Sequence, residues 1–132
     1  MNRLLLDTTF LIDAERSGSD LDVVIDDDDD VAVAAITIAE LRVGALLASH
    51  RHRTTRGAYV DDIVSGIPVL GYGLDVAEHH AELLVEVRSQ GQPRGAHDLI
   101  IAATAKAFSR TVVTADASAF HDLPGVAVQP AR

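Results

Sequence analysis

Short apolar runs without polar alternation are the feature that most constrains the fold of this chain. They occupy residues 4–6, 31–35, 68–70, 111–114 and 126–128. Each run is too short to make a helix, and uninterrupted apolar runs of this length are typical of strands buried on both faces. The sequence therefore predicts strands that lie inside the protein, with other elements covering both of their faces.

Helical patterns separate these runs. A helix is expected directly after the first strand, and others over residues 21–27, 38–50, onward to about residue 65, 74–90 and 96–109. Strands that alternate with helices favour an α/β sandwich around a mainly parallel sheet. The 132 residues fit one domain, 1–132, which is large enough to bury a core.

Composition limits the classes of function. The chain has no cysteine, which excludes disulfides, cysteine nucleophiles and zinc–thiolate sites. Its formal net charge of −9 argues against a general binder of polyanions. No apolar run approaches the roughly 18 residues that a membrane span needs. We therefore expect a soluble, cytoplasmic protein with no membrane partner.

Four acidic residues occupy comparable places in this arrangement. Asp7 directly follows the first predicted strand, and Asp116 comes two residues after another, so both lie where parallel strands end. Glu40 and Asp98 fall near the starts of two predicted helices, which lie near the same edge of the sheet. We expect all four carboxylates to converge on one pocket.

Helical spacing places Glu40 and Asp98 on faces that we expect to point inward. Glu40 shares its face with Val43, Gly44 and Leu47, and Asp98 shares another with Ile101, Ala102, Ala105 and Phe108. Residues 37–40 also match a capping box, with Thr37 as the N-cap and Glu40 at the third position. A carboxylate at the end of an apolar, inward face is unusual unless a ligand requires it.

Bringing four carboxylates together is unfavourable without a cation. Two like charges 4 Å apart repel by about 4 kcal/mol at an effective dielectric constant of 20, and a helix N-terminus returns only about 0.3–1 kcal/mol. An all-oxygen ligand set selects Mg²⁺ or Mn²⁺ over zinc or copper, and such ions activate water for phosphodiester hydrolysis. The expected metal ligands are Asp7, Asp98 and Asp116, Glu40 completes the catalytic set, and the supporting hydroxyls are those of Thr8, Thr9 and Thr114.

Each acid taken alone also has an ordinary structural explanation. Asp7 could be a turn or cap residue, and the capping box accounts for Glu40. Asp98 could be a first-turn helix acid, and Asp116 could cap a short helix. His97 adjoins Asp98 but points about 100° away from it on a helix, which argues against a role as general base. The separate explanations do not predict that the four acids share equivalent places.

Four segments are more specific together than any of them is alone. They are residues 4–12 (LLLDTTFLI), 37–41 (TIAEL), 97–105 (HDLIIAATA) and 113–116 (VTAD), the last followed by Phe120. In this order, and over nearly the whole chain, they resemble the PIN-domain nucleases and more narrowly the VapC toxins of bacterial toxin–antitoxin pairs. His97 lies outside the general pattern of that family, and members often carry Asn where this chain has Asp116.

The resemblance implies a PIN-like three-layer α/β/α sandwich and a Mg²⁺- or Mn²⁺-dependent endoribonuclease that acts as a toxin. Its catalytic quartet would be Asp7, Glu40, Asp98 and Asp116, with Thr114 beside them. The resemblance also implies an RNA substrate, a homodimer, and a cognate VapB-like antitoxin that wraps the toxin and reaches into its active site. DNA binding by this chain alone is not expected.

Charge is unevenly placed along the chain. A weak RNA-binding surface is predicted from the local excess of arginine at Arg42, Arg51, Arg53 and Arg56, to which Arg94 and Arg110 could add. The alternative is a solvated helix face that pairs in part with Asp61 and Asp62. The surrounding segment, 38–65, has more apolar residues than one buried stripe requires. The resemblance implies that this region receives the antitoxin, and an amphipathic helix in a groove is the physical form that such binding would take. Five consecutive aspartates at 26–30 predict a solvated loop, or else a docking patch for an arginine-rich partner.

Other functions remain open at this point. A catalytically idle PIN-fold binding module would keep the fold and the antitoxin surface, although the intact quartet argues against it. A receiver-type phosphoacceptor domain needs adjacent acids after its first strand and a lysine after a late one, whereas Asp7 stands alone and Lys106 lies within a predicted helix. A haloacid-dehalogenase-type phosphatase needs a second acid two residues after Asp7, where this chain has Thr9.

Overall fold

The computed structural model describes residues 1–18 and 25–131. Within these residues a five-stranded sheet has the order β3-β2-β1-β4-β5, and every neighbouring pair is parallel. The strands are β1 (Arg3–Leu6), β2 (Asp30–Ala34), β3 (Val69–Leu70), β4 (Thr111–Thr114) and β5 (Val128–Pro130). The predicted parallel sheet is therefore confirmed.

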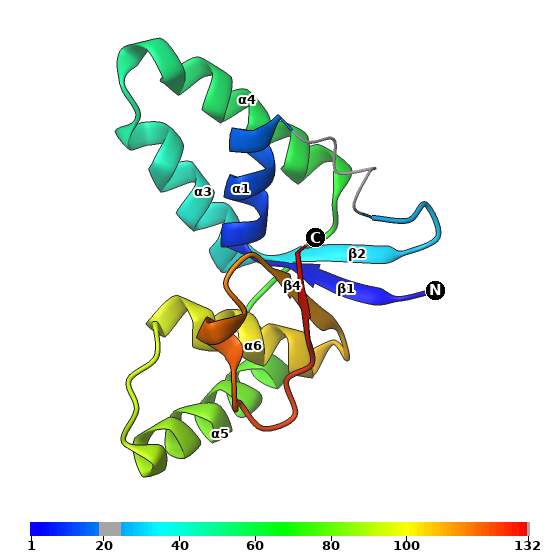
Figure 1. Ribbon diagram of the computed structural model, residues 1–132, viewed down its shortest axis with the longest axis vertical. Helices are drawn as coiled ribbons and strands as arrows, with labels where there is room; N and C mark the ends of the chain where they lie inside the picture. Colours follow the sequence, from blue (N-terminus) through cyan, green and yellow to red (C-terminus); the bar gives the residue numbers. More distant parts are fainter. Residues whose placement is uncertain (19–24, 132) are drawn as a thin grey trace.

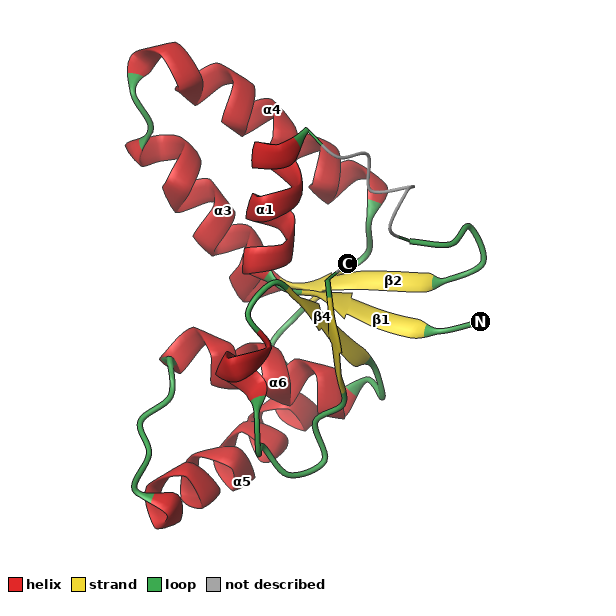
Figure 2. Ribbon diagram, viewed as in Figure 1, coloured by secondary structure: helices red, strands yellow, loops and turns green. Residues whose placement is uncertain are grey.

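Helices cover both faces of this sheet (Figures 1 and 2). One face packs against α1 (Thr8–Ser17), α3 (Ala35–Leu47) and α4 (His50–Gly66). The other face packs against α5 (Leu74–Gln90), α6 (Ala96–Ala107) and the short 3₁₀ helix η1 (Ala117–Phe120). This arrangement confirms the three-layer α/β/α sandwich. None of the helices in the described ranges has both the length and the apolar character that crossing a bilayer requires.

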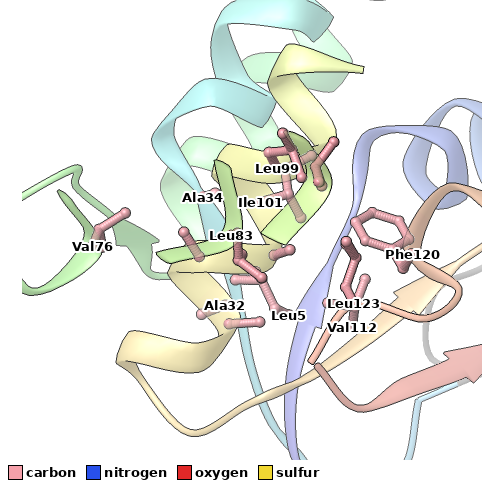
Figure 3. Close-up of a cluster of buried hydrophobic side chains, with 14 residues drawn as sticks. Leu5, Ala32, Ala34, Val76, Leu83, Leu99, Ile101, Val112, Phe120 and Leu123 are labelled. Atoms are coloured by element: carbon pink, nitrogen blue, oxygen red, sulfur yellow. The ribbon is translucent and has the colours of Figure 1, made fainter. Parts of the chain in front are cut away.

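The core is aliphatic and divided by the sheet into two clusters. In the central strand β1, Leu4 and Leu6 face α1, α3 and α4, whereas Leu5 faces α5 and α6. Side chains alternate across a strand, so a continuous apolar run supplies both clusters at once. Figure 3 shows the second cluster, in which Leu5 of β1 and Val112 of β4 lie with Phe120 and Leu123 from the segment after β4.

The predictions for the last strand and for a helix over residues 21–27 have different outcomes. The last strand begins at Val128 instead of residue 126, because its pairing with β4 runs from Val128 to Pro130, and a proline is tolerated on an edge strand. The expected helix over 21–27 falls mostly outside the described residues. Residues 26–29 form a turn, in which the backbone N–H of Asp29 donates to the carbonyl of Asp26 at 3.0 Å.

The predicted capping box is wrong. Strand β2 runs directly into α3, which begins at Ala35 with Ala34 as an N-cap that makes no side-chain hydrogen bond. Thr37 is therefore the third residue of the helix, fully buried, and Glu40 lies in the second turn. No turn separates strand from helix here, so the polar residue expected to cap the helix instead lies inside the protein.

The predicted inward face of α3 is also wrong, while that of α6 is confirmed. Val43 and Leu47 are 53% and 81% exposed, and the buried face of α3 is formed by Thr37, Leu41 and Ala45. Figure 1 shows why: α3 and α4 extend away from the sheet, so only one stripe along α3 has a neighbour to cover it. In α6, by contrast, Ile101, Ala102 and Ala105 on the face of Asp98 are buried, and Phe108, the C-cap, is partly buried against the same cluster.

Candidate active site

The predicted acids gather where the strand order reverses. The chain proceeds from β1 outward through β2 to β3, and later returns to place β4 on the other side of β1. Asp7 directly follows β1, Thr114 ends β4, and Asp116 follows it. In open parallel sheets, ligands bind beyond the carboxyl ends of the strands at such a switch point.

Asp7 is both a helix cap and a buried carboxylate. It is 2% exposed and is the N-cap of α1, accepting a hydrogen bond from the backbone N–H of Phe10 at 2.8 Å. The hydroxyls of Thr9 and Thr114 also donate to it, at 2.9 Å and 2.5 Å. Burial nevertheless raises the pKa of Asp7, and this effect outweighs the three hydrogen bonds that lower it. The structure therefore shows the cap role of Asp7, and its role in an active site stays a prediction.

All three predicted supporting threonines contact a predicted site residue. Thr9 and Thr114 lie 3.1 Å apart beside Asp7, and Thr114 Oγ1 accepts the backbone N–H of Asp116 at 2.9 Å. Thr8 points the other way and donates to Glu40 Oε1 at 2.7 Å. The hydroxyls thus connect the ends of β1 and β4 with α3.

Asp98 lies in the first turn of α6 and faces the other acids. Burial raises the pKa of Asp98 most, the charges of Glu40, Asp7 and Asp116 raise it further, and His97 lowers it. Asp98 is therefore within electrostatic reach of the three other carboxylates. In the described residues, no arginine or lysine forms an ion pair with any of them, so their mutual repulsion has no fixed cation to offset it.

A cleft of about 660 Å³ gives access to Asp98 and Asp116. Residues 92–95 form one wall and η1 with His121 forms the other. Gly95, the N-cap of α6, fits closely against Asp98, since a Cβ atom at this position would lie 2.7 Å from Asp98 Oδ2. The glycine therefore makes room for this carboxylate at the cleft.

His97 is a neighbour of the site that the sequence analysis left without a role. Its Nδ1 lies 3.2 Å from Glu40 Oε2, so its ring joins α6 to α3. Helical spacing predicts that His97 points away from Asp98, but it does not reveal which helix lies beside His97. Only the packing of α3 beside α6 supplies that information.

The arginines divide into structural and exposed ones. Arg42 pairs with Asp61 at 2.7 Å, as the solvated-face alternative predicted, whereas Arg51, Arg53 and Arg56 are exposed and make no ion pair within the described chain. Arg110 does not add to an RNA surface as expected. It is buried beneath the sheet edge and donates to the Leu4 carbonyl and to the backbone and side chain of Asp30.

Arg94 is occupied by backbone carbonyls. Its guanidinium donates to the carbonyls of Ser118 and Ala119 at 3.1 Å and 3.5 Å, and to that of His121 at 2.5 Å. The arginine therefore ties the loop before α6 to η1 across one end of the cleft, and it is not free to bind RNA as expected.

The run of five aspartates lies at the opposite edge of the sheet from the candidate site. Asp26, Asp28 and Asp29 bring carboxylate oxygens within 4.8 Å of one another in a mostly exposed turn, which confirms a solvated loop for this part of the run. Asp30 differs, because it begins β2 and pairs with Arg110 at 3.0 Å and with Arg3 at 3.5 Å.

Comparison with known proteins agrees with this fold. The profile of the PIN domain matches residues 4–126. Ribonuclease VapC5 of Mycobacterium tuberculosis is 33% identical over 112 residues, which cover 85% of this chain and 82% of the relative. The tRNA(fMet)-specific endonuclease VapC of Salmonella typhimurium is 29% identical over 99 residues, covering 75% of this chain and 74% of the relative.

A solved structure extends the likeness to the whole chain. The crystal structure of VapBC-5 from Mycobacterium tuberculosis, a member of the VapBC family of toxin–antitoxin systems, superimposes with a TM-score of 0.79 and 31% sequence identity. The superposition covers 100% of this chain and 99% of the other. This chain therefore belongs to the PIN-domain family, within the group of the VapC ribonucleases.

Proposed function

We propose that this chain is a Mg²⁺- or Mn²⁺-dependent endoribonuclease that a VapB-like antitoxin holds inactive in the cytoplasm. The observation that carries the proposal is the group of four carboxylates, without a paired arginine or lysine, at the switch point of the sheet. Relatives named as ribonucleases and endonucleases support the reaction type.

The donor set fits a hard divalent cation. All the groups at the site are oxygen donors, and the raised pKa values of Asp7 and Asp98 show that their anions are poorly stabilised by the protein alone. Asp7, Asp98 and Asp116 would hold the ion, with Glu40 beside them. Once bound, such a cation supplies Lewis-acid stabilisation of a phosphodiester and an activated water.

The chain's own contribution is to orient these groups. Thr9 and Thr114 fix both oxygens of the Asp7 carboxylate, and Thr8 fixes Glu40. The cleft beside Asp98 and Asp116 exposes them to a nucleic-acid backbone while Asp7 stays buried. Carboxylates held in this way need little rearrangement during the reaction.

RNA would approach an acidic protein with the help of a few exposed arginines. Arg51, Arg53 and Arg56 are exposed residues of α4 and make no ion pair in the described residues. Contacts of this kind are to phosphates, so affinity falls as salt rises and does not depend on sequence. We expect cleavage to be fastest at low ionic strength.

The exposed apolar stripe on α3 fits the proposed antitoxin. Val43, Leu46 and Leu47 are 53%, 58% and 81% exposed on the part of the helix that extends beyond the sheet. An amphipathic partner helix would cover this stripe, and acidic residues on it would meet Arg51 and Arg53 at the start of α4. The likeness to a structure described as VapBC-5 supports a partner of this class.

We also propose that the chain forms a homodimer. Tyr72 and Leu74 are exposed beside the edge strand β3, and Val85 is exposed on α5. Large apolar side chains left exposed in this region favour a protein–protein contact. Sedimentation velocity should give a dimer for the wild type and a monomer for Leu74→Glu. A monomeric wild type at micromolar concentration would contradict the dimer without touching the proposed activity.

RNA cleavage by the purified chain tests the proposed activity. A folded RNA pool is incubated with Mg²⁺, Mn²⁺ or EDTA, and Asp98→Asn is compared with Asp13→Asn, which removes an exposed acid of α1. We expect discrete fragments that require metal, are lost in Asp98→Asn and persist in Asp13→Asn. Metal-independent cleavage, or equal cleavage by both variants, would refute the proposal. A folded wild type that binds Mn²⁺ but leaves every RNA intact would favour the idle binding module.

A further inference from the structure

The Glu40 carboxylate is held from two sides by two different elements. Thr8 of α1 donates to Oε1 at 2.7 Å, and Nδ1 of His97 in α6 lies 3.2 Å from Oε2. The Thr8 hydroxyl also points toward Thr37 Oγ1, but at the longer distance of 3.2 Å, so its single proton is directed mainly at Glu40. One oxygen of Glu40 is therefore held by Thr8, and the second depends on His97.

We propose that His97 is a positioning residue that keeps the Glu40 carboxylate turned toward the metal site. The inference rests on the proposed function, because it assigns a task at the same site. Glu40 lies where the buried and exposed faces of α3 meet, with 27% of its side chain exposed, and a glutamate has three rotatable side-chain bonds. Without His97, solvent would be the competing partner of Oε2.

The charges around Glu40 make this contact important. Asp98 lies close enough to Glu40 for the charge of each to affect the other, so repulsion favours rotamers of Glu40 that point away from the site. In the described residues, His97 is the one side chain of α6 that hydrogen-bonds Glu40. His97 therefore gives Glu40 a hydrogen-bond donor from the same helix turn that carries the repelling Asp98.

The hydrogen bond also fixes the state of the imidazole. To donate to Glu40, the ring must carry its proton on Nδ1, so a neutral His97 is in the Nδ1–H tautomer. An asparagine side chain places an amide N–H at the same number of bonds from the backbone as Nδ1. His97→Asn can therefore keep the contact, whereas His97→Ala cannot.

Calorimetric titration with Mn²⁺ tests the proposal directly. Groups that orient metal ligands typically change metal affinity by 10- to 100-fold when removed. Because His97 acts through one oxygen of a partly buried glutamate, we expect about a 10-fold weaker affinity in His97→Ala and less than about a 3-fold change in His97→Asn. His80→Ala is the matched control, since its Nδ1 makes a 2.8 Å contact with the Tyr72 hydroxyl far from the site. Equal Mn²⁺ affinities in the wild type and His97→Ala would overturn the proposal.

Cleavage kinetics separate positioning from direct contact with RNA. His97 is 55% exposed, so its ring could instead bind the substrate. A positioning role predicts a lower kcat in His97→Ala with KM nearly unchanged, and rescue by His97→Asn. A raised KM with unchanged kcat and unchanged Mn²⁺ affinity would mean that His97 binds RNA, which would also overturn the proposal.

NMR of the metal-free protein tests the contact apart from any activity. The ¹⁵N shifts of the His97 ring should report the Nδ1–H tautomer in the wild type and a shift toward the Nε2–H tautomer in Glu40→Ala. An identical ring spectrum in both proteins would show that His97 does not hold Glu40. Failure of the wild type to bind Mn²⁺ would instead refute the proposed function and the role at a metal, even if the tautomer result were as expected.

Discussion

Without metal, Asp98→Asn should be more stable than the wild type. With excess metal, the variant should be less stable than the wild type. Asp98 faces three like charges, and only His97 opposes them. Unlike Asp7, it accepts no hydrogen bond that asparagine would lose within the described chain. The substitution therefore removes repulsion while leaving the packing of α6 unchanged.

The magnitude follows from charge and exposure. A like charge a few ångströms away costs about 1 kcal/mol in a water-like dielectric and about 4 kcal/mol at an effective dielectric constant of 20. Asp98 is only half-buried, so a net gain of about 1 to 2 kcal/mol is reasonable after solvent screening. For a chain of this size, that raises Tm by about 3 to 10 °C.

Metal reverses the order of the two proteins. At a hundred times its Kd, a bound cation stabilises the wild type by about 2.7 kcal/mol, which exceeds the advantage of the variant. Thermal unfolding in EDTA and in excess Mn²⁺ should therefore give opposite rankings of the wild type and Asp98→Asn. A variant less stable than the wild type in EDTA would refute the reasoning, because Asp98 would then be a structural residue.

The difference in stability between Asp98→Asn and the metal-free wild type should depend on pH. A carboxyl whose pKa is raised by folding binds more protons in the native state, so it favours folding at low pH and loses that contribution as pH rises through the raised value. The pKa of Asp98 is raised from 3.8, so Asp98→Asn and the wild type should be equally stable below about pH 4 in EDTA. The advantage of the variant should then grow as the pH increases.

Three further outcomes are expected elsewhere in the molecule. Gly95 has a backbone conformation that alanine adopts freely, so Gly95→Ala should leave Tm within a few degrees of the wild type. Its Cβ should displace the Asp98 carboxylate and therefore weaken Mn²⁺ binding measured by calorimetry. Unchanged Mn²⁺ binding would contradict the close contact. Arg110→Met should lower the free energy of unfolding, measured in urea, by about 2 to 3 kcal/mol, because it leaves Asp30 and a strand carbonyl without their hydrogen-bond donor. A loss below about 0.5 kcal/mol, on the order of one exposed ion pair, would argue against a buried structural role for Arg110. In Tyr72→Phe, spectrophotometric titration of the remaining Tyr59 should give a pKa of about 12, because burial and the charge of Glu15 raise it; titration near pH 10 would place Tyr59 in solvent.

Helices and strands could be predicted from the sequence where a local pattern determines the structure. The predicted helix over 74–90 coincides with α5, and the run at 4–6 lies within β1, because apolar periodicity and the absence of alternation are properties of the segment itself. The positions of the four acids could also be predicted. Each follows a strand or lies near the start of a helix, and the topology of a parallel sheet restricts where those elements lie.

Side-chain exposure and contacts could not be predicted where they depend on which helices and strands lie side by side. The exposure of Val43 and Leu47 reflects the extension of α3 beyond the sheet, and nothing in the residues of α3 specifies how far the sheet reaches. Nothing in the sequence distinguishes Arg110 from an arginine on the surface. It becomes a buried donor only because the starts of β1 and β2 lie beside it. His97 and Glu40 are 57 residues apart in sequence, so their contact becomes visible only after folding.

The contacts of Arg94 have a consequence for how a phosphodiester is received. Three carbonyl oxygens, from Ser118, Ala119 and His121, would otherwise present partial negative charge at the mouth of the cleft. The guanidinium covers these oxygens and leaves part of its own charge at the cleft wall. An anionic strand therefore meets a less repulsive entrance, although Arg94 itself is saturated by the backbone. The arginine lowers an electrostatic barrier to entry by shielding the protein's own dipoles.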